Sequence, residues 1–220
     1  MSEMLTVERV HWYSGGVFEI QFQRNGIEFF PGDCLALFAA DETTSRPYSV
    51  SSGMGEDLIR FVIRRMPDGA VSTYLSERRP GDRVKASPPF GWFRPGQHPE
   101  FRFVFIATGT GISPFLSHLR SRPENPPILC LFGARKAADA VEVDWLKRQC
   151  DLRLAISREK VVGAHHGRVT ELLEEIPIES TSHYYLCGLD AMIDEVMLWL
   201  ENRGVALTQV HCECFFSAAG

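Results

Sequence analysis

The sequence has no hydrophobic run that approaches the roughly 20 residues needed to cross a bilayer as a helix. It also lacks an excess of basic residues, because 23 Lys and Arg stand against 28 Asp and Glu and give a net charge of -5. This balance argues against a general nucleic-acid binder. Residues 1–5 show no basic segment followed by an apolar one, so no secretory signal is indicated and a cytoplasmic location is the default expectation. These absences predict a protein without membrane or nucleic-acid partners.

The six cysteines follow neither the spacing of a disulfide-rich scaffold nor that of a zinc site. They also do not reproduce the plant-type iron-sulfur spacing, which excludes a fused cluster of that type from these residues. Cys212 and Cys214 would share one face of a strand, where packing is favoured over the binding of a soft metal. We therefore expect no metal site and mostly buried thiols.

The pattern of the sequence changes near its middle. Up to about residue 96, short segments typical of strands alternate with turn residues, at 17–23, 33–38, 46–50, 58–64 and 82–86. This rhythm predicts an antiparallel β-barrel. A stretch rich in proline and glycine follows at residues 88–99, so the 220 residues are predicted to form two domains, 1–97 and 98–220.

The second half has the pattern of an α/β domain. Apolar strand candidates at 102–106, 128–132, 152–156, 184–186 and 209–215 are separated by segments long enough to be helices. This alternation predicts a doubly wound parallel sheet. In the last helical segment apolar residues recur at i, i+3 and i+4, and Gly204 follows its end. We interpret this stripe as part of the core and not as a binding site.

Arg46, Tyr48 and Ser49 stand at positions i, i+2 and i+3 of one short segment. A guanidinium pairs with phosphate, an aromatic ring offers a stacking face, and a hydroxyl donates a hydrogen bond. This combination is typical of a surface for a flavin ring. The alternative is an ordinary strand that begins after a turn.

Gly69, Val71 and Ser72 stand at the start of an apolar helical segment, where backbone N–H groups and the helix dipole suit a pyrophosphate. A serine N-cap after a turn is the alternative interpretation. Arg64, shortly before, either reaches phosphate or belongs to a solvated basic edge. Two contacts of the phosphate type favour FAD over FMN.

Gly109, Thr110, Gly111 and Pro114 lie between an apolar strand and an apolar helix, which is the context of a dinucleotide-binding loop. The loop departs from the G-x-G-x-x-G fingerprint because Pro114 takes the position of the third glycine. Proline is tolerated in the first turn of a helix. We predict that this loop receives a nicotinamide dinucleotide, with a purely structural loop as the alternative.

Ser157 and Arg158 follow the strand at 152–156, at the end of the sheet where doubly wound folds receive ligands. A serine and an arginine suit the 2′-phosphate of NADP. Glu159, the next residue, would instead favour NAD if it bound the ribose. We predict NADP as the cofactor, with NAD as the alternative.

In their order along the chain, these motifs resemble the ferredoxin-NADP reductase superfamily. The resemblance implies that Tyr48 stacks on the flavin, that Ser49 hydrogen-bonds near its reactive nitrogen, and that Arg46 pairs with its phosphate. It covers nearly the whole chain, including a Cys-Gly turn at positions 187 and 188 and an aromatic residue near the end.

The same resemblance assigns roles to the last strands. Cys187 and Gly188 would face the nicotinamide, and Glu213 would be the superfamily's terminal acidic residue. Phe215, with Phe216 as a rival, would cover the flavin ring. Residues 217–220 continue beyond this aromatic, whereas the superfamily often ends near it.

The implied activity is that of a flavoenzyme that transfers a hydride from NADPH to FAD and passes electrons singly to a separate ferredoxin or flavodoxin. The residues with catalytic roles would be Ser49, Cys187 and Glu213. Alternatives are a reductase that uses free flavin as its substrate and a redox-sensing, flavin-binding subunit. An acidic carrier would need a local basic face, and candidates for it are Arg60, Arg64, Arg65, Arg78, Arg79 and Lys85.

Overall fold

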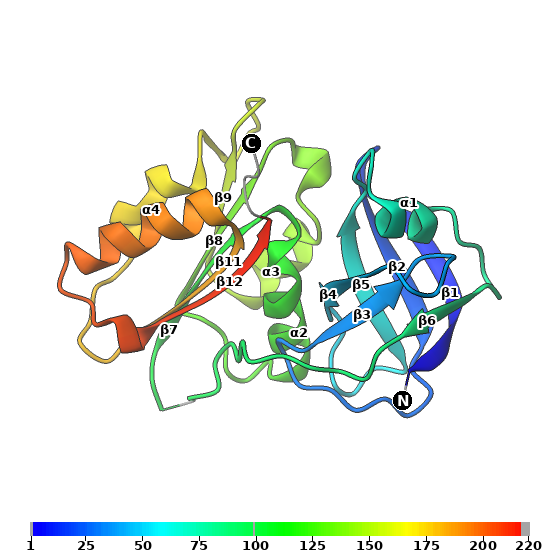
Figure 1. Ribbon diagram of the computed structural model, residues 1–220. Coiled ribbons are helices and arrows are strands. Elements are labelled where there is room, and N and C mark those ends of the chain that lie inside the picture. The colour runs from blue at the N-terminus through cyan, green and yellow to red at the C-terminus, as the bar shows by residue number, and fades with distance from the viewer. Residues whose placement is uncertain (1, 99, 217–220) are drawn as a thin grey trace. The chain divides into compact units, whose positions relative to one another are not determined.

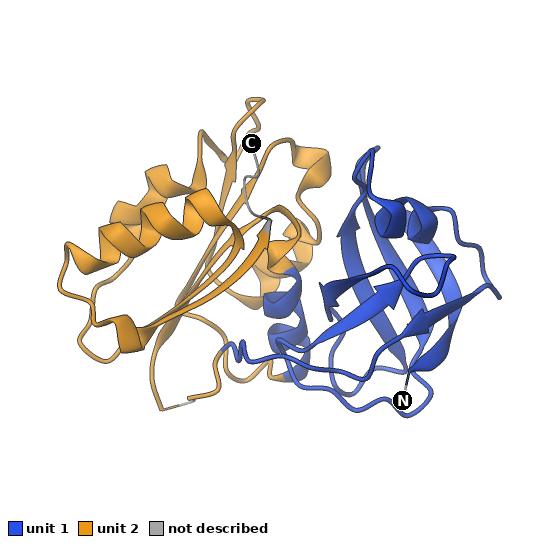
Figure 2. Ribbon diagram, viewed as in Figure 1, with its two compact units in different colours: residues 1–95, 113–121 blue, residues 96–112, 122–220 orange. Residues whose placement is uncertain are grey.

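The computed structural model describes residues 2–98 and 100–216 (Figure 1). Its contacts divide the chain into two compact units (Figure 2). Unit 1 comprises residues 1–95 and 113–121, and unit 2 comprises residues 96–112 and 122–220. The predicted fold class, an antiparallel barrel followed by a parallel α/β domain, is confirmed.

Unit 1 is a six-stranded antiparallel sheet with the order β4-β3-β6-β1-β2-β5. The two edge strands, β4 and β5, approach each other where the N–H of Ser51 donates to the carbonyl of Arg60 at 2.8 Å. This contact closes the sheet into a barrel, with a seam between β4 and β5. The elements of the barrel are β1 (Glu3–Trp12), β2 (Val17–Gln23), β3 (Cys34–Phe38), β4 (Ser45–Ser49), β5 (Leu58–Arg64), α1 (Ala70–Ser76) and β6 (Arg83–Ala86).

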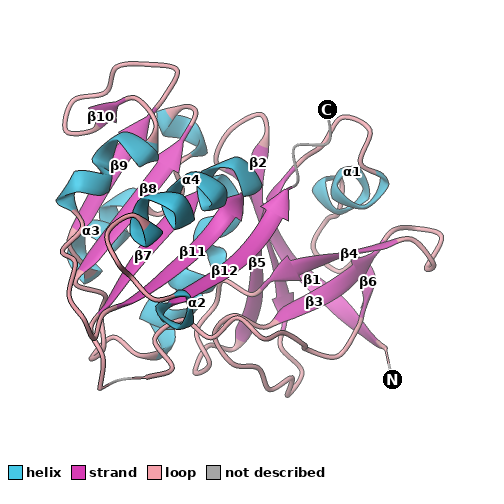
Figure 3. Ribbon diagram, turned by 60° about the vertical axis from the view of Figure 1, so that its left-hand side comes forward, coloured by secondary structure: helices cyan, strands magenta, loops and turns pink. Residues whose placement is uncertain are grey.

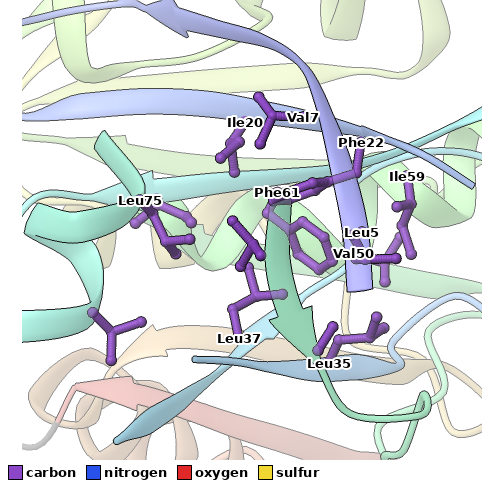
Figure 4. Packing of buried hydrophobic residues seen from close by; sticks show 14 of the residues in the cluster. Leu5, Val7, Ile20, Phe22, Leu35, Leu37, Val50, Ile59, Phe61 and Leu75 are labelled. Atoms are coloured by element: carbon purple, nitrogen blue, oxygen red, sulfur yellow. The ribbon is translucent and has the colours of Figure 1, made fainter. Parts of the chain in front are cut away.

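Alternation of apolar residues fills the barrel, because successive side chains of a strand point to opposite faces of the sheet. Leu5 and Val7 of β1 and Ile20 and Phe22 of β2 are almost fully buried, and Figure 4 shows them packed around Phe61. The pattern of the sequence does not predict β1. A register shift between residues 7 and 9 interrupts its alternation, which hides the strand from a pattern search.

Unit 2 contains a six-stranded parallel sheet with the order β10-β9-β8-β7-β11-β12 (Figure 3). The order reverses at β7, so the switch point lies between β7 and β11 at the carboxyl ends of these strands. The strands are β7 (Phe103–Thr108), β8 (Leu129–Ala134), β9 (Leu152–Ile156), β10 (His165–His166), β11 (His183–Leu189) and β12 (Val210–Phe216). The helices are η1 (Gly109–Ile112), η2 (Ala137–Asp139), α3 (Val143–Gln149), η3 (Val169–Glu175), α4 (Asp190–Glu201) and η4 (Leu207–Gln209).

The parallel strands carry nearly continuous apolar runs, as expected for strands covered on both faces. All residues of β8 are buried, and so are the first five of β7. On α4, Met192, Ile193, Val196 and Leu200 are buried against the sheet and η3. The apolar stripe of this helix therefore belongs to the core. Among the described residues, no helix combines the length and the apolar character that spanning a bilayer requires.

The remaining helix, α2 (Ser113–Ser121), follows η1 in the chain but belongs to unit 1 by its contacts. The Ser117 hydroxyl donates to the Ser52 carbonyl at 2.8 Å, and Nη1 of Arg120 donates to the Ser51 carbonyl at 2.7 Å. Each residue therefore holds a carbonyl of the segment that follows β4. Residues 113–121, which are distant in sequence from the barrel strands, thus belong to the barrel unit.

Stacked rings connect the starts of β11 and β12 in unit 2. Nδ1 of His183 lies 2.9 Å from Nε2 of His211, and Tyr185 stacks on His211 with ring centroids 4.5 Å apart. Phe101 stacks on His183 with ring centroids 4.7 Å apart. Burial lowers the pKa of both imidazoles below the ordinary 6.5, and neighbouring histidines, including His98, lower it further. Both side chains are therefore expected to be neutral in the folded protein at neutral pH.

These lowered pKa values predict that acid destabilises the protein. Below about pH 6.5 the histidines of the unfolded chain bind protons, whereas His183 and His211 of the folded protein stay neutral to a lower pH. The stability that depends on neutral histidines is thus complete above that pH and is lost as the pH falls toward the lower pKa values of the folded state. We expect the urea midpoint to decrease between about pH 7 and pH 5, and to decrease less in His211→Phe, which keeps a stacking ring and removes one titration. An equally steep decrease in this variant would contradict the assignment.

Candidate functional site

Three of the predicted flavin residues, Arg46, Tyr48 and Ser49, lie on β4, at the seam of the barrel. Ser49 is buried, Tyr48 is half-buried against the barrel core, and Arg46 is exposed. Burial raises the pKa of Tyr48 to about 12, although the Arg46 charge opposes the shift. The phenol is therefore neutral at physiological pH. The strand offers a cation, a neutral aromatic ring and a hydroxyl along five residues, which is a donor set that fits a flavin with its phosphate.

The hydroxyl of Ser49 is held by the neighbouring strand. Cys34 of β3 lies directly opposite Ser49 in the sheet, and Sγ and Oγ are 3.2 Å apart. Cys34 also exchanges two backbone hydrogen bonds with Phe90, at 2.7 and 2.9 Å. Next to it, the buried Asp33 forms an ion pair with Arg94 at 2.7 Å. Cys34 was not among the predicted site residues, because its pairing with Ser49 depends on strand register.

The second predicted phosphate contact follows β5, the other strand of the seam. Arg64 ends β5, and α1 begins at Ala70 with Gly69 as its N-cap. A Cβ on Gly69 would lie 2.6 Å from Oγ of Ser72, so this turn requires glycine. Ser72 lies inside the helix and accepts a hydrogen bond from the Met66 N–H at 3.0 Å. The interpretation of Ser72 as an N-cap is therefore wrong.

Val71 contributes to the barrel core with its side chain, which is 2 % exposed. Only its backbone is available to a ligand. The first helical bond of α1 runs from the Thr73 N–H to the Gly69 carbonyl at 2.9 Å, so the N–H groups of residues 70–72 precede the helical ladder. The pyrophosphate role of this turn stays a prediction, as does the role of Arg64.

The predicted nucleotide loop lies at the switch point of the parallel sheet. Gly109, Thr110 and Gly111 form the tight turn η1 directly after β7. A Cβ on Gly111 would lie 2.4 Å from the carbonyl oxygen of Cys187. Because residue 111 lacks a side chain, the loop lies directly against Cys187 and Gly188, which belong to strand β11 and do not form the predicted turn. The structure thus brings two separately predicted motifs together within unit 2. Pro114, the last predicted residue of the loop, lies in the first turn of α2 and therefore in unit 1.

Thr108 joins the two motifs and was not among the predicted site residues. Its hydroxyl accepts a hydrogen bond from the Leu189 N–H at 2.9 Å, which connects the end of β7 to the end of β11. A Cβ on Gly188, whose φ is +141°, would lie 2.1 Å from this hydroxyl oxygen. Glycine at 188 is therefore required by both its backbone angle and its neighbour. The available signal was the position of Thr108 at the carboxyl end of an apolar strand.

Cys187 and Glu213, two of the residues with predicted catalytic roles, lie side by side. They are paired across β11 and β12, and Sγ of Cys187 lies 3.8 Å from Oε2 of Glu213. The register then shifts, so that Leu189 lies opposite residue 216 and Phe215 is the extra, half-buried residue of β12. The side chain of Phe216, the rival for the aromatic role, lies outside the described residues, as do residues 217–220.

The predicted 2′-phosphate residues follow β9, and the neighbouring strand β8 brings two cations that the sequence analysis did not name. Ser157 and Arg158 follow β9 and are exposed, and Arg135 and Lys136 follow β8 and are exposed as well. Two backbone bonds join these loops, from the Ser157 N–H to the Ala134 carbonyl at 3.0 Å and from the Arg158 N–H to the Arg135 carbonyl at 2.9 Å. The site therefore offers three cationic side chains and one hydroxyl, which is a donor set that fits a phosphate group.

Two family models match the chain in succession. Residues 13–94 match the oxidoreductase FAD-binding domain, and residues 105–197 match the oxidoreductase NAD-binding domain. The first match encloses the flavin residues on β4, and the second encloses η1, Cys187 and Gly188. Glu213 and Phe215 lie beyond both matched ranges.

Among curated proteins, the anthranilate 1,2-dioxygenase electron transfer component of Acinetobacter baylyi is 28 % identical over 207 residues, which cover 87 % of this chain. The chain spans 60 % of the length of that relative. A flavodoxin/ferredoxin-NADP reductase of Shigella flexneri is 27 % identical over 212 residues, which cover 85 % of both chains.

Among solved structures, a ferredoxin NADP+ reductase of Neisseria gonorrhoeae with bound FAD and NADP has a TM-score of 0.87 and 18 % sequence identity. The match covers 98 % of this chain and 99 % of the other. At this level of identity the likeness concerns the fold, which extends over the whole described chain.

Proposed function

Because this chain belongs to the ferredoxin-NADP reductase superfamily, with an FAD-binding domain followed by an NAD-binding domain, we propose that it passes electrons between NADPH and a separate one-electron carrier. One observation carries the proposal: two domain matches occur in the superfamily's order, and each encloses one of the cofactor motifs found in the sequence. The carrier is a ferredoxin or a flavodoxin, in line with the name of the Shigella relative.

FAD, when bound, accepts a hydride from reduced nicotinamide and gives up electrons one at a time. The protein itself binds the two cofactors, orients their rings and shields the flavin. The Tyr48 ring covers the flavin plane, the Ser49 hydroxyl donates to its reactive edge, and Arg46 pairs with its phosphate. The backbone of Gly109 and Gly111 approaches the pyrophosphate of the nucleotide.

The ends of β11 and β12 orient the nicotinamide in this proposal. The Cys187 thiol is buried and lies beside the Glu213 carboxylate, so it packs against the ring and does not act as a nucleophile. Phe215, at the irregular point of β12, shields the flavin. Because hydride transfer needs two rings in close, fixed contact, these residues act by positioning and not by covalent chemistry.

The choice of NADPH over NADH rests on the loops after β8 and β9. Arg135, Lys136 and Arg158 are exposed cations, and Ser157 adds a hydroxyl beside them. A phosphate monoester is a strong acceptor for such groups, whereas the unmodified ribose of NADH carries no charge there. The cytoplasmic location expected from the sequence stays a prediction.

The candidate basic face of the barrel is largely offset by nearby carboxylates. For four of these cations the structure gives an acidic partner within 4 Å, and such paired charges leave little net field for an acidic carrier. Salt is therefore expected to slow the reaction with a carrier only weakly. The pairs are Arg60 with Glu56 at 2.9 Å, Arg65 with Glu77 at 3.9 Å, Arg78 with Asp82 at 3.5 Å and Lys85 with Glu42 at 3.7 Å.

The proposal is tested by mixing the purified protein anaerobically with NADPH or NADH while recording its visible spectrum. We expect tightly bound FAD whose absorbance is lost at a much lower concentration of NADPH than of NADH, followed by reduction of added ferredoxin or flavodoxin. A colourless protein that accelerates the reduction of added flavin would indicate a free-flavin reductase instead. Bound flavin that neither nucleotide bleaches would indicate a redox-sensing subunit.

A further inference from the structure

Glu159 connects the two loops that carry the cations of unit 2. Its Oε1 accepts a hydrogen bond from the Ala137 N–H at 2.5 Å, across 22 positions of sequence. Ala137 begins η2, directly after Lys136. Glu159 directly follows Arg158, and its side chain is half-buried. The carboxylate therefore reaches from the loop after β9 to the loop after β8.

This contact replaces a missing cap. Lys136 is the N-cap residue of η2 and makes no side-chain capping bond, so the first N–H of the turn depends on a partner from elsewhere. Glu159 supplies that partner, and a bond to a charged acceptor is stronger than one to a neutral group. Its negative charge also belongs to two loops that carry several exposed cations, whose mutual repulsion a carboxylate reduces. These cations are Arg135, Lys136, Arg158 and Lys160.

From these contacts we infer that Glu159 is a positioning residue that favours NADPH, by holding Arg135 and Lys136 beside Ser157 and Arg158. The inference rests on the proposed function, because it concerns the same nucleotide site. It reverses the expectation for an acidic residue at this place, which would bind the ribose and select NAD. One oxygen of the carboxylate is already engaged by a backbone N–H, and that N–H belongs to the loop of the phosphate-binding cations.

The two interpretations predict opposite effects of removing the carboxylate. In Glu159→Ala, loss of the bond to Ala137 releases the loop after β8, so affinity for the 2′-phosphate is expected to fall about tenfold, the size of effect usual for one charge-assisted hydrogen bond. In Glu159→Gln the amide oxygen still accepts from Ala137, so affinity is expected to stay within about threefold of the parent. A ribose-binding carboxylate would give the reverse result, with a stronger preference for NADPH in both variants.

The direct measurement is a calorimetric titration of the purified full chain with 2′-phospho-AMP and with AMP, which needs no turnover. We expect 2′-phospho-AMP to bind more tightly than AMP, and Glu159→Ala to weaken only the former. Steady-state kinetics with ferricyanide as acceptor should then show a raised KM for NADPH, with kcat and the NADH parameters unchanged. Glu201→Ala is the matched control, because it removes a carboxylate where α4 ends, at the opposite edge of the sheet.

Three results would overturn the inference. They are a tighter 2′-phospho-AMP complex in Glu159→Ala, equal weakening of AMP and 2′-phospho-AMP, and no preference for 2′-phospho-AMP in the parent chain. Failure of the proposed function looks different. A chain that prefers 2′-phospho-AMP through Glu159 but whose flavin is not reduced by NADPH would retain this inference and lose the proposed activity.

Discussion

Gly111→Ala is expected to lower the free energy of unfolding by about 1–3 kcal/mol, the usual cost of forcing an atom into a packed contact. The new Cβ would lie 2.4 Å from the Cys187 carbonyl oxygen and 2.7 Å from the Cα of Gly188. Both are backbone atoms of a paired strand, so η1 has to move instead. A displacement of about 1 Å at a reacting site costs about 10²-fold in rate, so reduction of bound flavin by NADPH should slow by that order. Urea unfolding and anaerobic stopped-flow absorbance measure the two effects.

Gly55→Ala is the matched control for this prediction. Gly55 also lacks a positive φ, and a Cβ built on it would meet nothing within 4 Å. The control should therefore be neutral or slightly stabilising, because alanine reduces the freedom of the unfolded chain. If Gly111→Ala behaved like this control in both measurements, the close packing of η1 against β11 would not matter for the nucleotide site.

Ser49→Ala is expected to slow flavin reduction by NADPH about 10²-fold, which is the usual effect of removing one aligned donor from a reacting centre. FAD content should stay unchanged, since the Tyr48 ring and the Arg46 charge remain. The hydroxyl is buried, and its Oγ lies 3.2 Å from Sγ of Cys34. The rate is measured in single-turnover experiments on protein with a known flavin content. Ser45→Ala, at the other end of β4, serves as control because Arg46 contacts only its backbone carbonyl, at 2.8 Å.

Cys34 extends this second prediction. Cys34→Ala should reduce the same rate by only about threefold, because a thiol forms a weak hydrogen bond and acts through Ser49. The double variant should then be no slower than Ser49→Ala alone, as expected for two residues that act as one unit. If the two losses in rate were additive in the double variant, Cys34 would act independently of Ser49. If Ser49→Ala reduced flavin at the parent rate, the hydroxyl would have no role in the proposed chemistry.

The sequence predicted those features that depend on local pattern. Strand periodicity and turn residues indicated most of the barrel, and the change to longer apolar segments indicated the parallel sheet. The loop at Gly109 was recognised because its meaning depends on a strand before it and a helix after it. Arg46, Tyr48 and Ser49 could be predicted as flavin residues for a similar reason, since they are close in sequence, and their role stays a prediction.

The features that escaped the sequence analysis depend on register or on distant contacts. Cys34 faces Ser49 only because β3 and β4 pair in one particular register. Thr108 meets the Leu189 N–H across parallel strands that are far apart in the chain. The partner of Glu159 is a backbone group, which has no signature in the sequence. Pairings of this kind follow from the assembled sheet, and local propensity carries no information about them.

The membership of α2 in the barrel unit determines how the molecule can be dissected. Splitting the chain between residues 97 and 98 would put this helix on one fragment and the carbonyls of Ser51 and Ser52 on the other. The first fragment would lose the donors for these two carbonyls, and the second would carry α2 without Phe93, whose ring contacts Phe115 at 5.9 Å. Neither fragment is therefore expected to keep its structure alone. The two halves have to be studied in the intact polypeptide or as two fragments mixed together.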